Sequence, residues 1–413
     1  MKHLRRRNDC RLCGSTDLEC VLPIRPSAIG DAFIAADRLS EAQETYPLDT
    51  YLCLDCGHLQ NLDIVDPELL FKHYTYRTSA SLGLVEHFKR YAASVVNTLA
   101  VAADSLVVEI GSNDGSLLKA FQALGLKVVG IDPAQNIASE ATAAGIPTAA
   151  DFFSSALARR IRAERGPAVL VCANNVFAHA DNLADIVAGI HALLAPGGAF
   201  VFEVSYVPDI IDNVVFDTIY HEHVSHHALI PLERFFRTLD MTLFDAERVT
   251  SKGGSIRGFA QVLSTGVRER TPRLQQLMMT EEARGIARPK IYREFYDEIE
   301  RRKQATLQYV DAALASGKSV AAYGASTTTT TLLYHFELGH RLGFIVDDNP
   351  AKQGLYSPGY HLPVYDSSQL LERRPDVVVI AAWMYADTII KRNQEFLERG
   401  GRFLVPLPEL KMV

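Results

Sequence analysis

The sequence predicts an α/β protein with an N-terminal zinc-binding module and two α/β units, the first built on a doubly wound parallel sheet. Three observations lead to this prediction. Two C-x2-C cysteine pairs lie near the N-terminus. From residue 105, short β-branched runs alternate with helical patterns, which is typical of parallel sheets covered by helices on both faces. The same alternation starts again at residue 319.

Composition excludes several classes of protein. The 413-residue chain is 48% hydrophobic and 22% charged, as expected for a folded protein of two or three domains. A net charge of −7 offers no basic surface for nucleic acid or membrane. The basic cluster at residues 2–7 lacks the apolar run of a signal peptide. We therefore expect a cytoplasmic monomer that binds neither nucleic acid nor membrane.

The four paired cysteines predict a structural Zn2+ site. Cys10 and Cys13 form one pair, Cys53 and Cys56 the other, and a glycine after each pair permits the turn that aims two thiolates at one ion. Four thiolates leave no open coordination position, so a catalytic zinc is not expected. Two redox-active C-x-x-C motifs are the alternative, but no βαβ pattern lies beside them. His58 is a spare donor that we leave out of the site.

The alternating runs define the elements of the two α/β units. Residues 67–103 are expected to be largely helical. Strands of the first unit are predicted at residues 105–110, 127–132, 168–176 and 198–205. The alternation then stops until about residue 270. A long helix is predicted at 272–316, followed by strands within 319–327, 343–350 and 376–383 and in the final "RFLVPLP". The expected domains are residues 1–66, 67–270 and 271–413.

The first strand of the first unit ends in a glycine loop, "EIGSNDGS". Its pattern is E-x-G-x-x-x-G, Glu109 to Gly115, so the close pyrophosphate approach of a G-x-G-x-x-G dehydrogenase loop is missing. Asp132 ends the second strand, where an acid can accept from both ribose hydroxyls. Asp151 and Phe152 follow the third strand position, where they can hold and cover adenine. These details favour S-adenosylmethionine over NAD(H) and over a turn without a ligand.

Several motifs together resemble those of the S-adenosylmethionine-dependent sugar C-methyltransferases, which build branched deoxysugars on nucleotide carriers. They are the cysteine pairs, "YTYRTS", "EIGSNDGS", "ANNVFAH", "YHEHVSHH", "KGGSIRGF" and "AAYGAST". The resemblance is strongest to the C-3′-methyltransferases of dTDP-tetronitrose biosynthesis. It implies a class I methyltransferase-like central unit and a Rossmann-like, substrate-binding C-terminal unit. It also implies cofactor contacts from Glu109, Gly111, Asn113, Gly115, Asp132, Asp151, Phe152 and Asn174.

The implied reaction transfers a methyl group to C-3′ of a dTDP-linked 3-amino-4-keto-2,3,6-trideoxy sugar. A carbon next to a ketone becomes nucleophilic when a base removes its proton and the charge spreads onto oxygen as an enolate. Such an enzyme needs a base, a group that stabilises the enolate oxygen and a fixed geometry. A different nucleotide-linked ketosugar and an NAD(P)-dependent nucleotide-sugar reductase are the alternatives.

The segment "YHEHVSHH" is the candidate catalytic segment. The zincin spacing H-E-x-x-H fails at Ser225, and a metal cage of histidines has no obvious further ligand. By resemblance, His223 is the base and Tyr220 and Glu222 flank the sugar. His179, from the carboxyl edge of the sheet, faces it.

Two further motifs are weaker candidates. The loop "YGAST" offers a cradle for a diphosphate, or is an ordinary strand-to-helix turn with a Ser/Thr cap. Arg257 of "KGGSIRGF" is a candidate contact to the diphosphate or the sugar.

Overall fold

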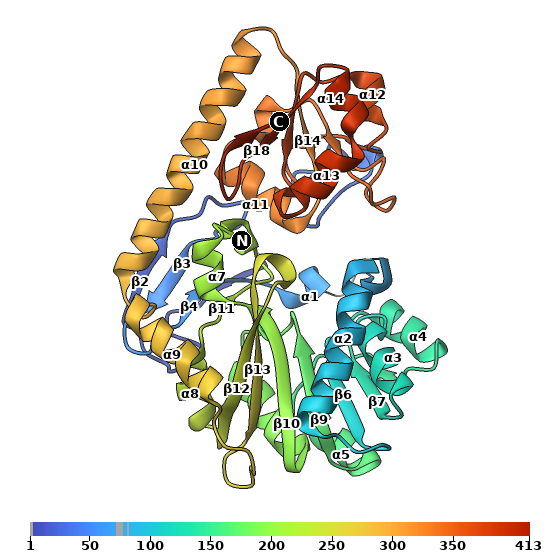
Figure 1. Ribbon diagram of the computed structural model, residues 1–413, viewed down its shortest axis with the longest axis vertical. Helices are drawn as coiled ribbons and strands as arrows, with labels where there is room; N and C mark the ends of the chain where they lie inside the picture. The colour runs from blue at the N-terminus through green and yellow to red at the C-terminus, as the bar shows by residue number, and fades with distance from the viewer. Residues whose placement is uncertain (1–2, 72–76, 81) are drawn as a thin grey trace.

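The computed structural model describes residues 3–71, 77–80 and 82–413 (Figure 1). Tyr74 and Tyr76 of the motif "YTYRTS" lie outside the described residues. Three bodies of structure follow one another: an N-terminal zinc-binding module, a central α/β unit and a C-terminal α/β unit. Among the described residues, no helix is both long enough and apolar enough to cross a bilayer.

The N-terminal module is a small antiparallel sheet. Its own strands are β2 (Leu18–Leu22), β3 (Thr50–Cys53) and β4 (Leu59–Asn61). A fourth strand, β11 (Ser225–His226), comes from the histidine-rich segment far along the chain and pairs with β4. Strand β1 (Leu4–Arg6) pairs separately with β5 (Asp63–Val65).

The central unit has a seven-stranded sheet in the order β12-β13-β10-β9-β6-β7-β8. Five strands are parallel: β6 (Leu106–Ile110), β7 (Lys127–Ile131), β8 (Thr148–Ala149), β9 (Ala168–Asn174) and β10 (Leu194–Ser205). Strands β6, β7, β9 and β10 match the four predicted runs, because buried apolar and β-branched residues fill them on both faces. The two-residue strand β8 was not predicted as a run. The antiparallel hairpin of β12 (Met241–Val249) and β13 (Ser255–Val262) extends one edge and was not predicted.

Helices cover both faces of this sheet. Buried side chains of α2 (Leu82–Leu99), α3 (Ser116–Ala123) and α4 (Gln135–Ala143) share one core cluster. Those of α5 (Ser155–Arg165), α6 (Leu183–Leu193) and α8 (Leu229–Arg237) belong to another, which also includes three zinc-site cysteines. The short helices α1 (Pro67–Phe71) and α7 (Val207–Asp212) flank the carboxyl edge.

The predicted helix at 272–316 is two helices. Helix α9 (Pro272–Arg284) ends at Gly285, which takes a left-handed conformation with φ of +70°. Helix α10 (Pro289–Ala315) then starts with a proline at its first position. It contacts β2 of the zinc module and β14 of the C-terminal unit, and runs along one side of the molecule (Figure 1).

The C-terminal unit is a six-stranded sheet in the order β16-β15-β14-β17-β18-β19. All neighbours are parallel except the last pair. The strands are β14 (Val320–Tyr323), β15 (Ile345–Val346), β16 (Val364–Tyr365), β17 (Val377–Ile380), β18 (Arg402–Val405) and β19 (Lys411–Met412). The helices are α11 (Thr327–His335), α12 (Gln369–Arg373), α13 (Ala386–Arg392) and α14 (Gln394–Glu398). This order is the Rossmann-like arrangement expected for this unit.

Candidate active site

A cavity of about 470 Å³ lies at the carboxyl edge of the central sheet. The glycine loop after β6, the ends of β7 and β9, and the first residues of the histidine-rich segment form its wall. Ligands of doubly wound folds bind at this edge. Most of the predicted site residues border it: Glu109, Gly111, Asn113, Asp132, Asp151, Phe152, Asn174, His179, Tyr220 and Glu222.

Two backbone features shape the glycine loop. Gly111 has a φ of +67°, and a Cβ there would lie 2.3 Å from Val176, so only glycine fits. Asn113 is also left-handed, with a φ of +48°. Its backbone N–H donates to one carboxylate oxygen of Asp132 at 2.9 Å, and the N–H of Ala134 donates to the other at 3.0 Å. Asp132 is thereby fixed at the cavity wall, with lone pairs left for a ligand.

Gly115 does not border the cavity. It is the N-cap of α3 with a φ of +73°, and a Cβ there would lie 3.0 Å from the side chain of Ile146. Its place in the pattern therefore follows from the turn into the helix.

Buried polar atoms in the wall lack protein partners. Both amide atoms of Asn174, the Oε2 of Glu109 and the Oγ of Ser112 have no hydrogen-bond partner among the described residues. Burial also raises the pKa of Glu109 well above its usual range. Unpaired buried polar groups are costly, and a bound ligand that completes them removes that cost. The wall therefore fits a polar ligand such as the adenosyl and methionyl parts of S-adenosylmethionine.

Tyr220 and His223 form a hydrogen-bonded pair beside this wall. The hydroxyl of Tyr220 donates to Nε2 of His223 at 2.9 Å, and the rings lie 4.0 Å apart. The Nδ1–H of His223 donates to the carbonyl of Thr218 at 2.7 Å, which fixes the tautomer. Tyr220 borders the cavity, whereas His223 lies behind it. Burial lowers the pKa of His223 and raises the pKa of Tyr220, so both groups are neutral.

Glu222 and His179 complete this end of the cavity. Burial raises the pKa of Glu222 to about 7. His179 stacks on Phe71 at 5.5 Å and lies 5.0 Å from the ring of His223. Its Nε2 has no partner among the described residues, and burial lowers its pKa to about 3. A neutral imidazole with a free nitrogen can exchange a hydrogen bond with a ligand.

The remaining histidines of the segment are structural. Nε2 of His221 donates to the carbonyl of Tyr46 at 3.2 Å, and that of His226 bonds to Oδ1 of Asn61 at 3.0 Å. His227 stacks on Phe177 with 5.4 Å between ring centroids. Among the described residues, the only group arranged to hold a metal is the cysteine set, so the histidine metal cage is not formed.

The four predicted cysteines converge. All four sulfur atoms lie within 4.8 Å of one another. The Cys10–Cys56 and Cys13–Cys53 sulfur pairs are both 3.6 Å apart. A tetrahedral site with Zn–S bonds of about 2.3 Å requires sulfur separations of about 3.8 Å. The geometry and the four-thiolate donor set fit Zn2+.

The prediction for Arg257 is wrong, and a neighbouring lysine was missed. Arg257 is buried between Glu203 at 3.0 Å and Glu247 at 2.7 Å, because it lies on a strand whose neighbours carry both acids. Lys252 borders the cavity instead. Its side chain is exposed to solvent, and the nearby carboxylates of Glu222 and Glu203 act to raise its pKa.

The turn that presents Lys252 is well defined. Lys252 is left-handed with a φ of +51°, and Gly254 follows with a φ of +124°. A Cβ on Gly254 would lie 2.4 Å from Asp209, so the turn needs glycine there. The Lys-Gly-Gly sequence was the signal that could have identified this residue.

The second glycine loop is satisfied by its own chain. Ser326 and Thr329 form a capping box at the start of α11. The backbone N–H of Ala325 donates to Asp347 at 2.6 Å. Of the two interpretations of "YGAST", these contacts favour the capped strand-to-helix turn.

Comparison with known proteins decides between the activities that the sequence left open. The C-methyltransferase NovU from Streptomyces niveus is 34% identical to this chain over 407 residues, which are 98% of this chain and 97% of NovU. The chain belongs to the C-methyltransferase family. Family models match along its length: a zinc binding domain at residues 10–71, a methyltransferase domain at 84–244 and a C-methyltransferase C-terminal domain at 250–408.

Solved methyltransferases resemble part of this C-methyltransferase. One is an S-adenosylmethionine-dependent methyltransferase from Clostridium acetobutylicum, 12% identical, with a TM-score of 0.35 over 43% of this chain and 92% of that one. Another is the magnesium protoporphyrin IX methyltransferase ChlM from Synechocystis, 13% identical, with a TM-score of 0.35 over 43% of this chain and 83% of that one.

The family assignment and the geometry agree. The protein is an S-adenosylmethionine-dependent C-methyltransferase with a structural zinc site. The reductase alternative is therefore not supported.

Proposed function

We propose that this enzyme transfers a methyl group from S-adenosylmethionine to C-3′ of a dTDP-linked 3-amino-4-keto-2,3,6-trideoxy sugar, acting as a cytoplasmic monomer. The main support is the Tyr220–His223 pair, whose Tyr220 borders the same cavity as the glycine loop. Proton abstraction and methyl donation can then take place in one cavity. We keep the proposed domains at residues 1–66, 67–270 and 271–413.

The cofactor is proposed to lie along the carboxyl edge of the sheet, where it supplies an electrophilic methyl group. Asp132 accepts from the ribose hydroxyls, because two backbone N–H groups already orient its carboxylate. Asp151 and the half-exposed Phe152 hold and cover the adenine. The buried side-chain atoms of Glu109 and Asn174 make further contacts with the cofactor. The turn at Gly111 and Asn113 lets the backbone approach the cofactor closely. Gly115 supports the loop from behind.

His223 is proposed as the base, acting through Tyr220. The phenol oxygen takes the α-proton of the sugar while the phenol proton moves to Nε2 of His223. The imidazolium that results keeps its hydrogen bond to the Thr218 carbonyl. An enolate formed nearby favours this charged state, because an opposite charge raises the pKa of a histidine that burial has lowered. Glu222 and His179 are proposed to hold the sugar.

Lys252 is proposed to face the enolate oxygen. It borders the same cavity as Tyr220 and Glu222, and it lies near enough to Glu222 for their charges to interact. A positive charge aimed at a developing oxyanion stabilises it.

The proposal is tested by incubating the enzyme with labelled S-adenosylmethionine and a panel of dTDP-linked 4-ketosugars. Mass spectrometry should find one labelled methyl group on the 3-amino-4-keto-2,3,6-trideoxy sugar. Methylation of a different ketosugar in preference to this one would refute the substrate assignment. Solvent deuterium should also enter the α-position in the presence of S-adenosylhomocysteine, which separates deprotonation from methyl transfer.

A further inference from the structure

The candidate catalytic segment is held by the zinc module. Its strand β11 forms the edge of the zinc module's sheet, with Ser225 opposite Gln60 and His226 opposite Leu59. The backbone N–H of Asn61 donates to the carbonyl of Val224 at 3.0 Å. Val224 directly follows His223, so the zinc module sets the position of the segment next to its proposed base.

A single side chain from within the zinc motif joins these parts. Arg11 lies between Cys10 and Cys13, and its side chain is fully buried. Nη1 donates to the carbonyl of Val224 at 2.5 Å and to Oε1 of Gln60 at 3.0 Å. Nη2 donates to the carbonyl of Asn61 at 2.9 Å. The planar fork thus spans the zinc motif, strand β4 and the catalytic segment.

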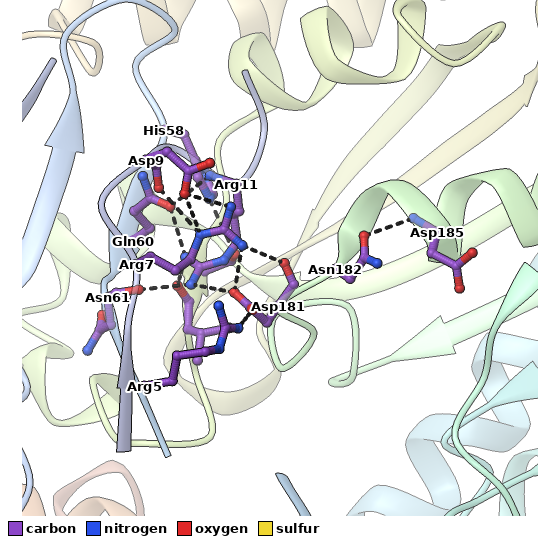
Figure 2. A network of polar contacts seen from close by, with 12 residues as sticks. Arg5, Arg7, Asp9, Arg11, His58, Gln60, Asn61, Asp181, Asn182 and Asp185 are labelled. Atoms are coloured by element: carbon purple, nitrogen blue, oxygen red, sulfur yellow. Dashed lines mark hydrogen bonds and ion pairs between the residues drawn. The ribbon is translucent and has the colours of Figure 1, made fainter. Parts of the chain in front are cut away.

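Arg11 also reaches the loop that carries His179. Its Nη2 lies 3.3 Å from Oδ1 of Asp181, two residues after His179. Figure 2 shows Arg5, Arg7 and Arg11 converging on this one carboxylate. Arg11 differs from Arg5 and Arg7. Within the part of the chain that the structure describes, it is the one of the three that also donates to the Val224 carbonyl. The two sides of the proposed base, the His179 loop and the Tyr220–His223 turn, therefore share one anchor.

We propose that Arg11 is a positioning residue that couples the zinc site to the catalytic segment. This rests on the proposed function only for the roles of Tyr220, His223 and His179. The physical reason is that a buried guanidinium with several acceptors permits one arrangement of the chains that supply them. Loss of the fork leaves the Val224 carbonyl with one donor fewer and Asp181 without its buried partner. The turn can then shift relative to the cofactor, and small misplacements of catalytic groups are costly.

The test compares full-length Arg11→Met and Arg11→Lys with wild type, and uses Arg7→Met as the matched control. Arg7 bonds to the same carboxylate at 3.0 Å but has no described contact with Val224. Hydrogen exchange measured by mass spectrometry should rise about tenfold or more in peptides covering 219–228 of Arg11→Met, the expected effect of unpairing buried groups. Peptides from β14 and β17 should exchange as in wild type. Lysine cannot reproduce the fork, so Arg11→Lys should show the same change in smaller degree.

Activity gives a second readout. Zinc content and affinity for S-adenosylhomocysteine should stay as in wild type for Arg11→Met, while kcat falls about 10- to 100-fold with little change in KM. Arg7→Met should match wild type in all measurements. Exchange and zinc content require no sugar substrate, so a wrong substrate assignment would leave these two results intact. If peptides 219–228 of a folded Arg11 variant exchange hydrogen at the wild-type rate, the proposal is overturned. It is also overturned if Arg7→Met raises exchange in these peptides as much as Arg11→Met does.

Discussion

The two α/β units contain the same local structure, a strand that runs through a glycine turn into a helix, but the buried side chains around the two turns differ. Around the first turn, Glu109 and Asn174 keep buried atoms without partners, and a cavity opens in front of Gly111. Around the second, the side chain of Ser326 caps the helix and Asp347 accepts from the loop backbone.

The difference shows what distinguishes a binding turn from a structural one. A glycine turn alone exposes helix-start N–H groups in both units. In both units, side chains of the fold accept from some of these N–H groups: Asp132 and Asp114 in the first, Ser326 and Asp347 in the second. In the first unit, buried side-chain atoms of Glu109, Ser112 and Asn174 at the carboxyl edge also have no partner within the described part of the chain, a destabilising arrangement unless a ligand completes it. We therefore assign cofactor binding and chemistry to the first unit, and five predictions test this contrast.

The largest effect is expected from loss of the zinc site. The zinc module pairs with the catalytic segment beside the first α/β unit, so the second unit should be unaffected. Cys53→Ser removes a zinc ligand whose site contributes about 10–16 kcal/mol to folding in small zinc domains. The zinc module should open, and β11 should lose its partner strand. Hydrogen exchange should rise in residues 50–61 and 220–227 and stay unchanged in β14 and β17. Elemental analysis showing no zinc in a fully active wild-type enzyme would contradict this prediction.

His223→Asn should cost about 10²–10⁴ in kcat, the usual contribution of a general base. Asparagine keeps similar size but cannot take the proton passed by Tyr220. Affinity for S-adenosylhomocysteine should not change, because His223 lies behind the cavity wall. Exchange of the sugar α-proton with solvent deuterium isolates the step. A wild-type exchange rate in His223→Asn, with loss in His179→Asn, would assign the base to His179.

Lys252→Met should lower kcat by about 10²–10³, as for removal of one stabiliser of an oxyanion. Lys252→Arg keeps the charge and should retain more activity. The measurement is kcat and KM for the ketosugar that the wild-type enzyme methylates. A rise in KM alone would mean that Lys252 binds the substrate without acting on the enolate.

Asp132→Ala should weaken S-adenosylmethionine binding by about 1–3 kcal/mol, because it removes the proposed acceptor of the ribose hydroxyls. Asp347→Ala changes an acid at the matching position of the second unit, where it accepts backbone N–H groups. It should leave this affinity unchanged. Calorimetric titration of both variants makes the comparison. Equal losses would place the cofactor partly on the second unit.

The sequence predicted those features that depend on local pattern. Buried β-branched runs located β6, β7 and β9, and cysteine spacing identified the zinc site. The sequence did not predict that β11 pairs with β4, because β11 has two residues and no periodicity of its own. Whether a charged residue faces a ligand also depends on distant neighbours: Arg257 is paired by Glu203 and Glu247, which no local pattern reveals.

The smallest effect is expected in the second turn. The side chain of Ser326 accepts from the N–H of Thr329, so Ser326→Ala removes one cap of α11 and should cost about 1 kcal/mol of stability. Because this turn is satisfied by its own chain, neither S-adenosylmethionine affinity nor kcat should change. Ser154→Ala is the matched control, since Ser154 caps α5 of the first unit in the same way through Leu157. Calorimetric unfolding should show similar small losses for both. If Ser326→Ala instead raised KM for the ketosugar more than Ser154→Ala did, the second turn would contact the substrate, and the contrast between the two units would fail.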